Sequence, residues 1–257
     1  MMKYNKITEL FNIKPALSLI FILRLVVLVF ISSTNALSQN DAKSAELIEK
    51  CETAMGGQQA YNAVKHLSWN FFGGRTLYWN KHNGDVRIEI PKDNKVLLWN
   101  ANTNQGKASI EGQEITDKEE LAKAMVQAKG IWINDSYWLV MPFKLNDPGV
   151  NQKYLGQKET LNGTMADVIE ITFNEVGNTP DNKYHIYFDP TSHLVNQWDF
   201  YRNFSDEKAS FAMPWQDYKP FGKVMLSGDR GERKLSDIKV FKKLPDSVYQ
   251  SFETVKI

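Results

Sequence analysis

The feature that most constrains the fold is a series of short segments in which apolar and polar residues alternate between turn residues. Residues Val86–Ile90 show it most clearly, because their apolar side chains are separated by Arg87 and Glu89. A period of two is typical of a strand with one buried and one solvated face, as in antiparallel sheets. Asn83-Gly84, just before this segment, is the strongest short signal for a hairpin. The pattern predicts an antiparallel β protein.

Similar segments recur on both sides of the middle of the chain. In the first hundred residues they predict strands at Leu67–Gly74, Thr76–Asn80, Asp85–Ile90 and Lys95–Asn100. In the last hundred residues they predict strands at Lys153–Leu161, Met165–Phe173, Lys183–Asp189, Leu194–Arg202, Ala209–Tyr218, Lys223–Gly228 and Lys234–Phe241.

Two regions have a helical period instead. Ser44–Val64 carries one apolar stripe, and Gly56-Gly57 is expected to end its first segment. In the middle of the chain, Asp117–Lys129 is predicted to be a helix with Thr116 as its N-cap.

The most aromatic stretch follows that helix. There, Asn134 or Asp135 is expected to cap a separate short helix that Pro142 terminates. This order of elements predicts a mainly β fold with helices (α+β). We expect a large curved antiparallel sheet, or unclosed half-barrel, covered by the N-terminal helix and the mid-chain helical insertion.

The N-terminus predicts export. Three lysines precede the apolar run Ala16–Ile31, and small residues at Ala36 and Ser38 favour cleavage after Ser38. Residues 1–38 are therefore predicted to be a signal peptide, with a mature N-terminus between Leu37 and Gln39 in a periplasmic or secreted protein. The alternative is an uncleaved membrane anchor. Against it, Arg24 interrupts the run, which is shorter than the about 20 apolar residues that span a bilayer.

Charge and cysteine content limit the classes of partner and membrane anchor that we expect. Residues 1–38 carry a net charge of +3, so the remaining chain is near −2 from a total of +1. No polybasic or acidic stretch remains, which argues against nucleic acid and against anionic membranes as partners. Cys51 is the single cysteine; it excludes an intramolecular disulfide and lies too far past the apolar run for lipidation. We expect no stable membrane anchor after cleavage.

Motifs for catalysis are absent from the sequence. The four histidines, His66, His82, His185 and His193, do not have the spacing of a metal site. The chain also contains no nucleophile motif and no phosphate-binding loop. We therefore predict no catalytic residues, no metal, no cofactor and no enzymatic activity.

Aromatic residues are abundant, with 14 Phe, 7 Trp and 10 Tyr. Two interpretations remain open. The aromatic side chains fill a core between sheet and helices, or a curved sheet leaves part of its concave face as an apolar ligand cavity. For the second interpretation the candidate ligand-binding residues are Trp99, Trp132, Tyr137, Trp138, Phe143, Trp198 and Phe200.

Several of these segments together resemble a known superfamily. They are the helix ending in Ala54-Met55-Gly56-Gly57, the aromatic insertion with Pro142, and the late hairpin Tyr184–Val195. This arrangement resembles the outer-membrane lipoprotein-sorting-protein-like (LolA-like) superfamily, in particular a secreted uncharacterised branch. The resemblance implies one β domain over residues 39–257, an unclosed barrel whose concave face holds acyl chains or another lipophilic ligand.

We therefore expect a carrier- or sensor-like protein of the cell envelope that binds a lipid or the acyl chains of a lipoprotein. Two alternatives from other classes stay open. One is a secreted enzyme acting on an envelope lipid or glycan, which requires convergent polar groups in a pocket. The other is a binding module for another envelope protein, which requires an exposed apolar patch.

The insertion Ile131–Phe143 gives the most specific expectation. It is predicted to cover the mouth or concave face of the sheet, with Trp132, Tyr137, Trp138 and Phe143 facing an apolar cavity. On that basis Trp138→Ala weakens binding of an apolar probe more than it lowers stability.

Overall fold

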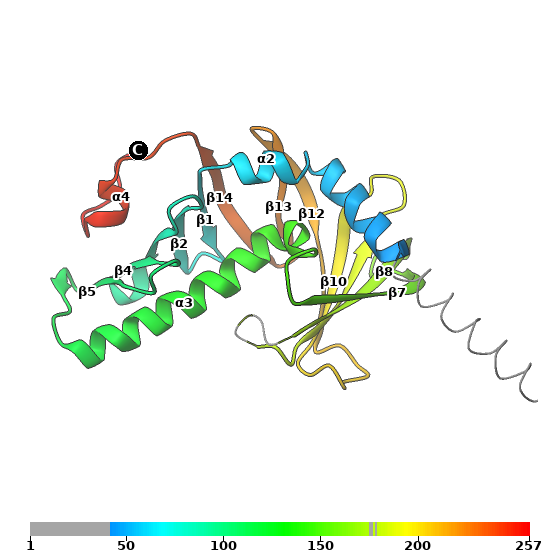
Figure 1. Ribbon diagram of the computed structural model, residues 1–257, viewed down its shortest axis with the longest axis horizontal. Helices are drawn as coiled ribbons and strands as arrows, with labels where there is room; N and C mark the ends of the chain where they lie inside the picture. Colours follow the sequence, from blue (N-terminus) through cyan, green and yellow to red (C-terminus); the bar gives the residue numbers. More distant parts are fainter. Residues whose placement is uncertain (1–41, 175–176, 178) are drawn as a thin grey trace, which may run out of the picture.

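The computed structural model describes residues 42–174, 177 and 179–257. The predicted signal peptide lies outside the described residues. The described chain forms two antiparallel sheets with helices packed against them (Figure 1). Neither sheet closes into a barrel, so the predicted mainly β fold with helices on a large open antiparallel sheet is confirmed.

The larger sheet has nine strands. Hydrogen-bonded neighbours are antiparallel, and the turns between consecutive strands are short. In spatial order the strands are β12 (Gln216–Phe221), β13 (Val224–Arg230), β14 (Arg233–Phe241), β1 (His66–Phe71), β2 (Arg75–Asn80), β3 (Asp85–Ile90), β4 (Lys95–Asn100), β5 (Gly106–Ile110) and β6 (Gln113–Glu114).

The smaller sheet has five strands and is also antiparallel throughout. In spatial order they are β11 (Phe211–Pro214), β10 (Val195–Tyr201), β9 (Lys183–Phe188), β8 (Met165–Phe173) and β7 (Val150–Glu159).

The chain passes between the two sheets at Trp215. The sequence predicted one strand across Ala209–Tyr218, and this is wrong, because β11 belongs to the smaller sheet and β12 to the larger one. The backbone N–H of Trp215 donates to the carbonyl of Asn196 at 2.8 Å. Its side chain is 1% exposed, and the Arg230 guanidinium lies 3.3 Å from the ring centre. Burial of this one large side chain therefore fixes the crossing point.

The mid-chain insertion is one continuous helix, α3 (Lys118–Val140), followed by the 3-10 helix η2 (Met141–Lys144). Asp117, not Thr116, is its N-cap and accepts hydrogen bonds from two backbone N–H groups of the first turn. Asp135 does not cap a second helix, because the helix runs through it. Gly130 costs about 1 kcal/mol inside a helix, which packing of α3 against the sheet offsets.

The other helices are short. Residues 42–54 are helical and lie over the smaller sheet (blue in Figure 1), followed by α2 (Gln58–Ala63). The turn that follows the first helix contains Gly56, whose φ is +100°, a backbone conformation that favours glycine. A side chain there would also collide with the carbonyl of Lys223. The remaining helices are η1 (Pro91–Asp93) and α4 (Ser247–Gln250).

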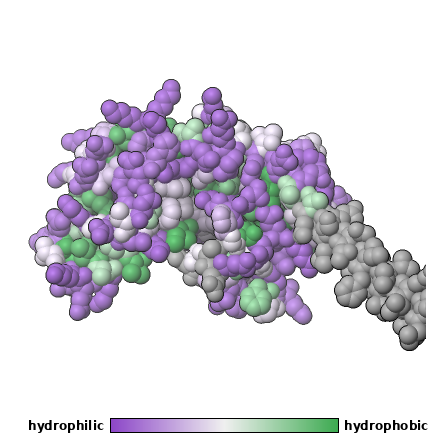
Figure 2. All heavy atoms as spheres, viewed as in Figure 1, coloured by the Kyte–Doolittle hydropathy of each residue, from purple (hydrophilic) through white to green (hydrophobic). Residues whose placement is uncertain are grey.

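One hydrophobic core joins the two sheets. Fully buried residues of the larger sheet, such as Trp69 and Ile88, belong to the same cluster as Ile169 and Trp198 of the smaller sheet. Residues of the first helix and of α3 complete this cluster. The face shown in Figure 2 is mostly hydrophilic, with separate apolar patches. Within residues 42–174, 177 and 179–257, no helix combines the length and the apolar character that crossing a membrane would require.

Candidate ligand-binding pocket

The C-terminal half of α3 is held to the larger sheet by an ion pair. Arg75 of β2 donates to Asp135 through two parallel hydrogen bonds, with Nε–Oδ2 at 2.5 Å and Nη2–Oδ1 at 2.8 Å. Asp135 is fully buried, and the Asn134 amide also donates to it at 2.9 Å. Bidentate pairs of this kind fix orientation as well as distance. The pair therefore sets the rotation of α3 about its axis.

A second arginine holds the end of the same helix. Arg230 of β13 is 1% exposed, and its Nη2 donates to the carbonyl of Trp138 at 2.7 Å. Its Nη1 donates to Ser227 Oγ at 2.8 Å. Burial lowers the pKa of Arg230 to about 9, so the side chain stays charged at neutral pH. Between them, the two arginines fix which residues of α3 face the smaller sheet.

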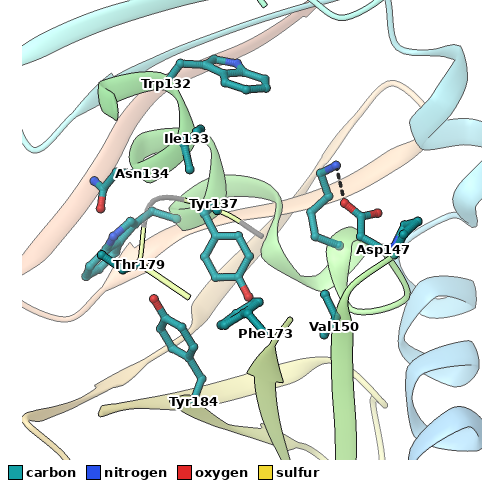
Figure 3. A pocket seen from close by; sticks show the side chains of 13 residues that line it. Trp132, Ile133, Asn134, Tyr137, Asp147, Val150, Phe173, Thr179 and Tyr184 are labelled. Atoms are coloured by element: carbon teal, nitrogen blue, oxygen red, sulfur yellow. Dashed lines mark hydrogen bonds and ion pairs between the residues drawn. The ribbon is translucent and has the colours of Figure 1, made fainter. Parts of the chain in front are cut away.

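A pocket of about 470 Å³ lies between this half of α3 and the smaller sheet. Its walls come from α3, from η2 and the turn after it, and from the ends of β7, β8 and β9 (Figure 3). The lining residues are Trp132, Ile133, Asn134, Tyr137, Trp138, Lys144, Asp147, Pro148, Val150, Phe173, Gly177, Thr179 and Tyr184.

Aromatic rings dominate the lining. The Tyr137 ring of α3 and the Tyr184 ring of β9 have centroids 5.7 Å apart, and Phe173 lies 5.9 Å from Tyr184. Beneath them, Trp198 stacks on Tyr184 at 5.2 Å and is 1% exposed. Trp138 meets Trp198 edge-on at 4.7 Å. The pocket wall is therefore the outer layer of the aromatic core, which holds its rings in place.

Polar groups lie at opposite sides of the pocket. Lys144 and Asp147 form an ion pair at 2.8 Å on one side, and Asn134 and Thr179 lie on the other (Figure 3). Burial raises the pKa of Tyr137 well above its ordinary value, helped by Tyr184 and Asp147. Burial also raises the pKa of Tyr184. Both tyrosines are therefore protonated at neutral pH.

The structure brings three of the seven candidate residues together in this pocket, namely Trp132, Tyr137 and Trp138. Trp198 lies directly behind the wall, and Phe200 stacks on Phe211 at 4.9 Å beside Tyr184.

The other two candidates lie elsewhere. Phe143 is 1% exposed and stacks on Tyr61 at 4.3 Å in the core, away from the pocket. Trp99 contacts the Trp132 ring at 5.4 Å but lines separate surface grooves beside β5 and α3. The insertion thus supplies part of the pocket and part of the core.

Several lining residues were not among the sequence-based candidates: Ile133, Lys144, Asp147, Val150, Phe173 and Tyr184. A signal existed for Phe173, since it continues the apolar face of Ile169 and Ile171 at the end of its strand. For the others the sheet topology was needed. Among the described residues, no group of three or more His, Cys, Asp or Glu side chains is arranged to hold a metal ion.

Comparison with known proteins adds little to this geometry. No protein-family model and no curated protein matches the sequence. Among solved structures, a DUF1329 family protein from Desulfovibrio piger is similar, with a TM-score of 0.43 and 10% identity over 81% of this chain and 97% of that chain. The structure of MucB in complex with MucA(peri) gives a TM-score of 0.22 and 8% identity over 82% of this chain and 60% of that chain. These values are too low to assign a family or to support a function.

Proposed function

We propose that this protein binds a lipophilic ligand, a lipid or the acyl chain of a lipoprotein, in the pocket between α3 and the smaller sheet. The observation that carries the proposal is the 470 Å³ pocket with five aromatic rings in its lining. Ligand sites have volumes of about 300–1,000 Å³ and are mostly apolar with a few placed polar groups. The lining fits that description.

The sequence supports the same role from another direction. The predicted signal peptide places the protein in the cell envelope or outside the cell, where lipids and lipoproteins are available. The resemblance to the LolA-like superfamily implies an unclosed sheet that holds acyl chains. We therefore propose a carrier- or sensor-like protein of the envelope.

The chemistry of the pocket favours ligand binding without catalysis. The charged lining residues Lys144 and Asp147 pair with each other, and the two lining tyrosines have raised pKa values. An efficient general acid or base needs a pKa near the working pH. Neither tyrosine meets that requirement, and the two charged side chains pair with each other, which is why we propose a ligand-binding protein and not an enzyme.

A pocket-filling substitution tests the proposal. Val150 lines the pocket at the start of β7, and Val150→Trp places an indole in it without leaving a cavity. We expect the affinity for the fluorescent dye N-phenyl-1-naphthylamine to fall about tenfold or more, equivalent to about 1.4 kcal/mol. Titration of the mature protein with the dye measures this.

The matched control adds the same side chain elsewhere. Leu161 is 60% exposed in the turn at the far end of the β7–β8 hairpin, so Leu161→Trp should leave dye binding unchanged. Equal affinities of wild type and Val150→Trp would contradict the proposal. Native mass spectrometry of the purified protein would then identify any lipid that co-purifies.

A further inference from the structure

Two hydroxyl groups in the pocket wall have no internal partner. Among the described residues, neither the Tyr137 nor the Tyr184 hydroxyl forms a hydrogen bond, although both side chains line the pocket. Five other tyrosine hydroxyls of the described residues are paired: Tyr154 with Asp167, Tyr187 with Asp199, Tyr201 with His185, Tyr218 with the carbonyl of Val195, and Tyr249 with His66. The hydroxyls of Tyr61 and Tyr78 form no hydrogen bond with described residues either, but neither side chain lines the pocket. Of the four tyrosine hydroxyls without a hydrogen bond among the described residues, two therefore line the candidate ligand site.

The two side chains enter the pocket from opposite walls. Tyr137 extends from α3 towards the sheet, whereas Tyr184 rises from β9 towards the helix (Figure 3). Their raised pKa values keep both phenols protonated at neutral pH, so each can donate a hydrogen bond. A molecule lying over these rings meets a donor from each side.

A pure hydrocarbon fits such a wall poorly. On entering, it would displace the water that solvates the hydroxyls and offer no acceptor in return. An unpaired buried hydroxyl weakens binding by about fivefold or more relative to a paired one. The wall therefore favours an apolar molecule that carries a hydrogen-bond acceptor.

The charges of the pocket limit what that acceptor is. Among the described lining residues, Lys144 is the positively charged one, and it is already paired with Asp147. A buried carboxylate or phosphate would have no unpaired cation beside it, and burying an uncompensated charge is costly. An uncharged acceptor avoids that cost.

We infer that the ligand carries an uncharged carbonyl oxygen within its apolar body, and that the Tyr137 and Tyr184 hydroxyls donate to it. The inference rests on the proposed function and refines it, because it states the ligand chemistry of the same pocket. An ester-linked acyl chain and a quinone share this chemistry.

Displacement of bound N-phenyl-1-naphthylamine tests the inference. The competitors are methyl dodecanoate, dodecanoate and an alkane of the same chain length, with decylbenzoquinone as the quinone arm. They are measured on wild type, Tyr137→Phe and Tyr184→Phe. The control is Tyr187→Phe, which removes a hydroxyl that donates to Asp199 at 2.7 Å and does not line the pocket.

We expect wild type to bind the ester or the quinone about fivefold or more tightly than the alkane and the carboxylate. Comparison of methyl dodecanoate with decylbenzoquinone also shows whether the pocket prefers an ester or a quinone. Each pocket Tyr→Phe variant should lose most of that preference. Its affinity for the ester or quinone falls, whereas its alkane affinity stays the same or rises because an unpaired hydroxyl has been removed. Tyr187→Phe should behave as wild type.

Equal binding of the carbonyl compounds and the alkane by wild type would overturn the inference, with no need for a variant. So would tightest binding of the carboxylate, or equal losses for all competitors in the Phe variants. Absence of dye binding altogether would instead refute the proposed function.

Discussion

The ion pair between Arg75 and Asp135 allows a quantitative prediction. Asp135 is fully buried, whereas the Arg75 side chain is 29% exposed. Arg75→Met leaves a buried carboxylate whose remaining side-chain donor is the Asn134 amide. Removing one partner of a buried pair costs about 3–5 kcal/mol. For a domain of this size that corresponds to a fall in Tm of roughly 10 °C.

Substitution of the acidic partner should lower the stability less. Asp135→Asn keeps a side chain of the same shape, and water can reach the remaining Arg75. We expect a loss of about 1.5–3 kcal/mol, the scale of one hydrogen bond with a charged group. The double variant Arg75→Met/Asp135→Leu removes both charges and should be more stable than Arg75→Met alone.

The cost of Arg75→Met should also depend on pH. Burial raises the pKa of Asp135 in the native protein, and Arg75 opposes that rise. Removing Arg75 therefore raises this pKa further above the unfolded value of about 3.9. Between those two values the native state binds more protons than the unfolded state, so stability falls as pH rises. The deficit of the variant is thus larger at pH 7.5 than at pH 4.5.

Chemical denaturation at both pH values, followed by tryptophan fluorescence, measures these differences. Each variant is compared with wild type at the same pH, which cancels the titration of other groups. A deficit that is the same at pH 4.5 and pH 7.5 would refute the reasoning. So would an Asp135→Asn variant that is less stable than Arg75→Met.

Three further predictions concern single side chains. Trp138→Ala should cost about 3–5 kcal/mol in a denaturation experiment, because Trp138 is 8% exposed and packs on Trp198; a loss below 1 kcal/mol would contradict this. Burial raises the pKa of Cys51 to about 12, so a thiol reagent should label it only after unfolding, and rapid labelling of native protein would show the burial to be wrong. Burial lowers the pKa of Lys81 from 10.5 to about 7. Between those values the native state binds fewer protons than the unfolded state, so stability rises with pH. Lys81→Met should flatten that rise in thermal melts from pH 7 to pH 10.

Strand positions were predictable where the pattern is local. The bounds of β3, β4 and β8 coincide with the sequence prediction. In β3, for example, Asn83-Gly84 marks the start and the alternation of charged and apolar residues marks its two faces. Strands β5 and β6 were not predicted, because Gly106–Ile110 lacks a clear alternation. Antiparallel pairing with β4 holds that segment extended, and such pairing depends on residues that the segment itself does not contain.

For the insertion, the local pattern predicted a break that the structure does not contain. Gly130 and the cap-like Asn134-Asp135 suggested that helix stops and restarts. The polar residue that resembled a cap is instead the buried partner of Arg75, sixty positions earlier in the chain. Such a contact depends on tertiary structure, so a local pattern cannot indicate it.

The candidate site, like the fold, was predictable only where its residues belong to one local segment. Trp132, Tyr137 and Trp138 belong to one segment, and their aromatic character alone singled them out. Val150, Phe173 and Tyr184 complete the pocket from three strands. They meet because β7, β8 and β9 are neighbours in the smaller sheet. That order is a property of the whole fold and not of any one strand.

The buried aromatic core and the proposed ligand pocket are two layers of one cluster. Trp198 is buried beneath the pocket wall, and Tyr184 stacks on it with its hydroxyl towards α3. A ligand over Tyr184 would therefore rest on the same cluster that stabilises the fold. Binding to the native state alone raises stability by about 2.7 kcal/mol at a ligand concentration of 100 times Kd. Because core and pocket share rings, aromatic truncation would weaken both together, and removal of a single hydroxyl is the perturbation that separates them.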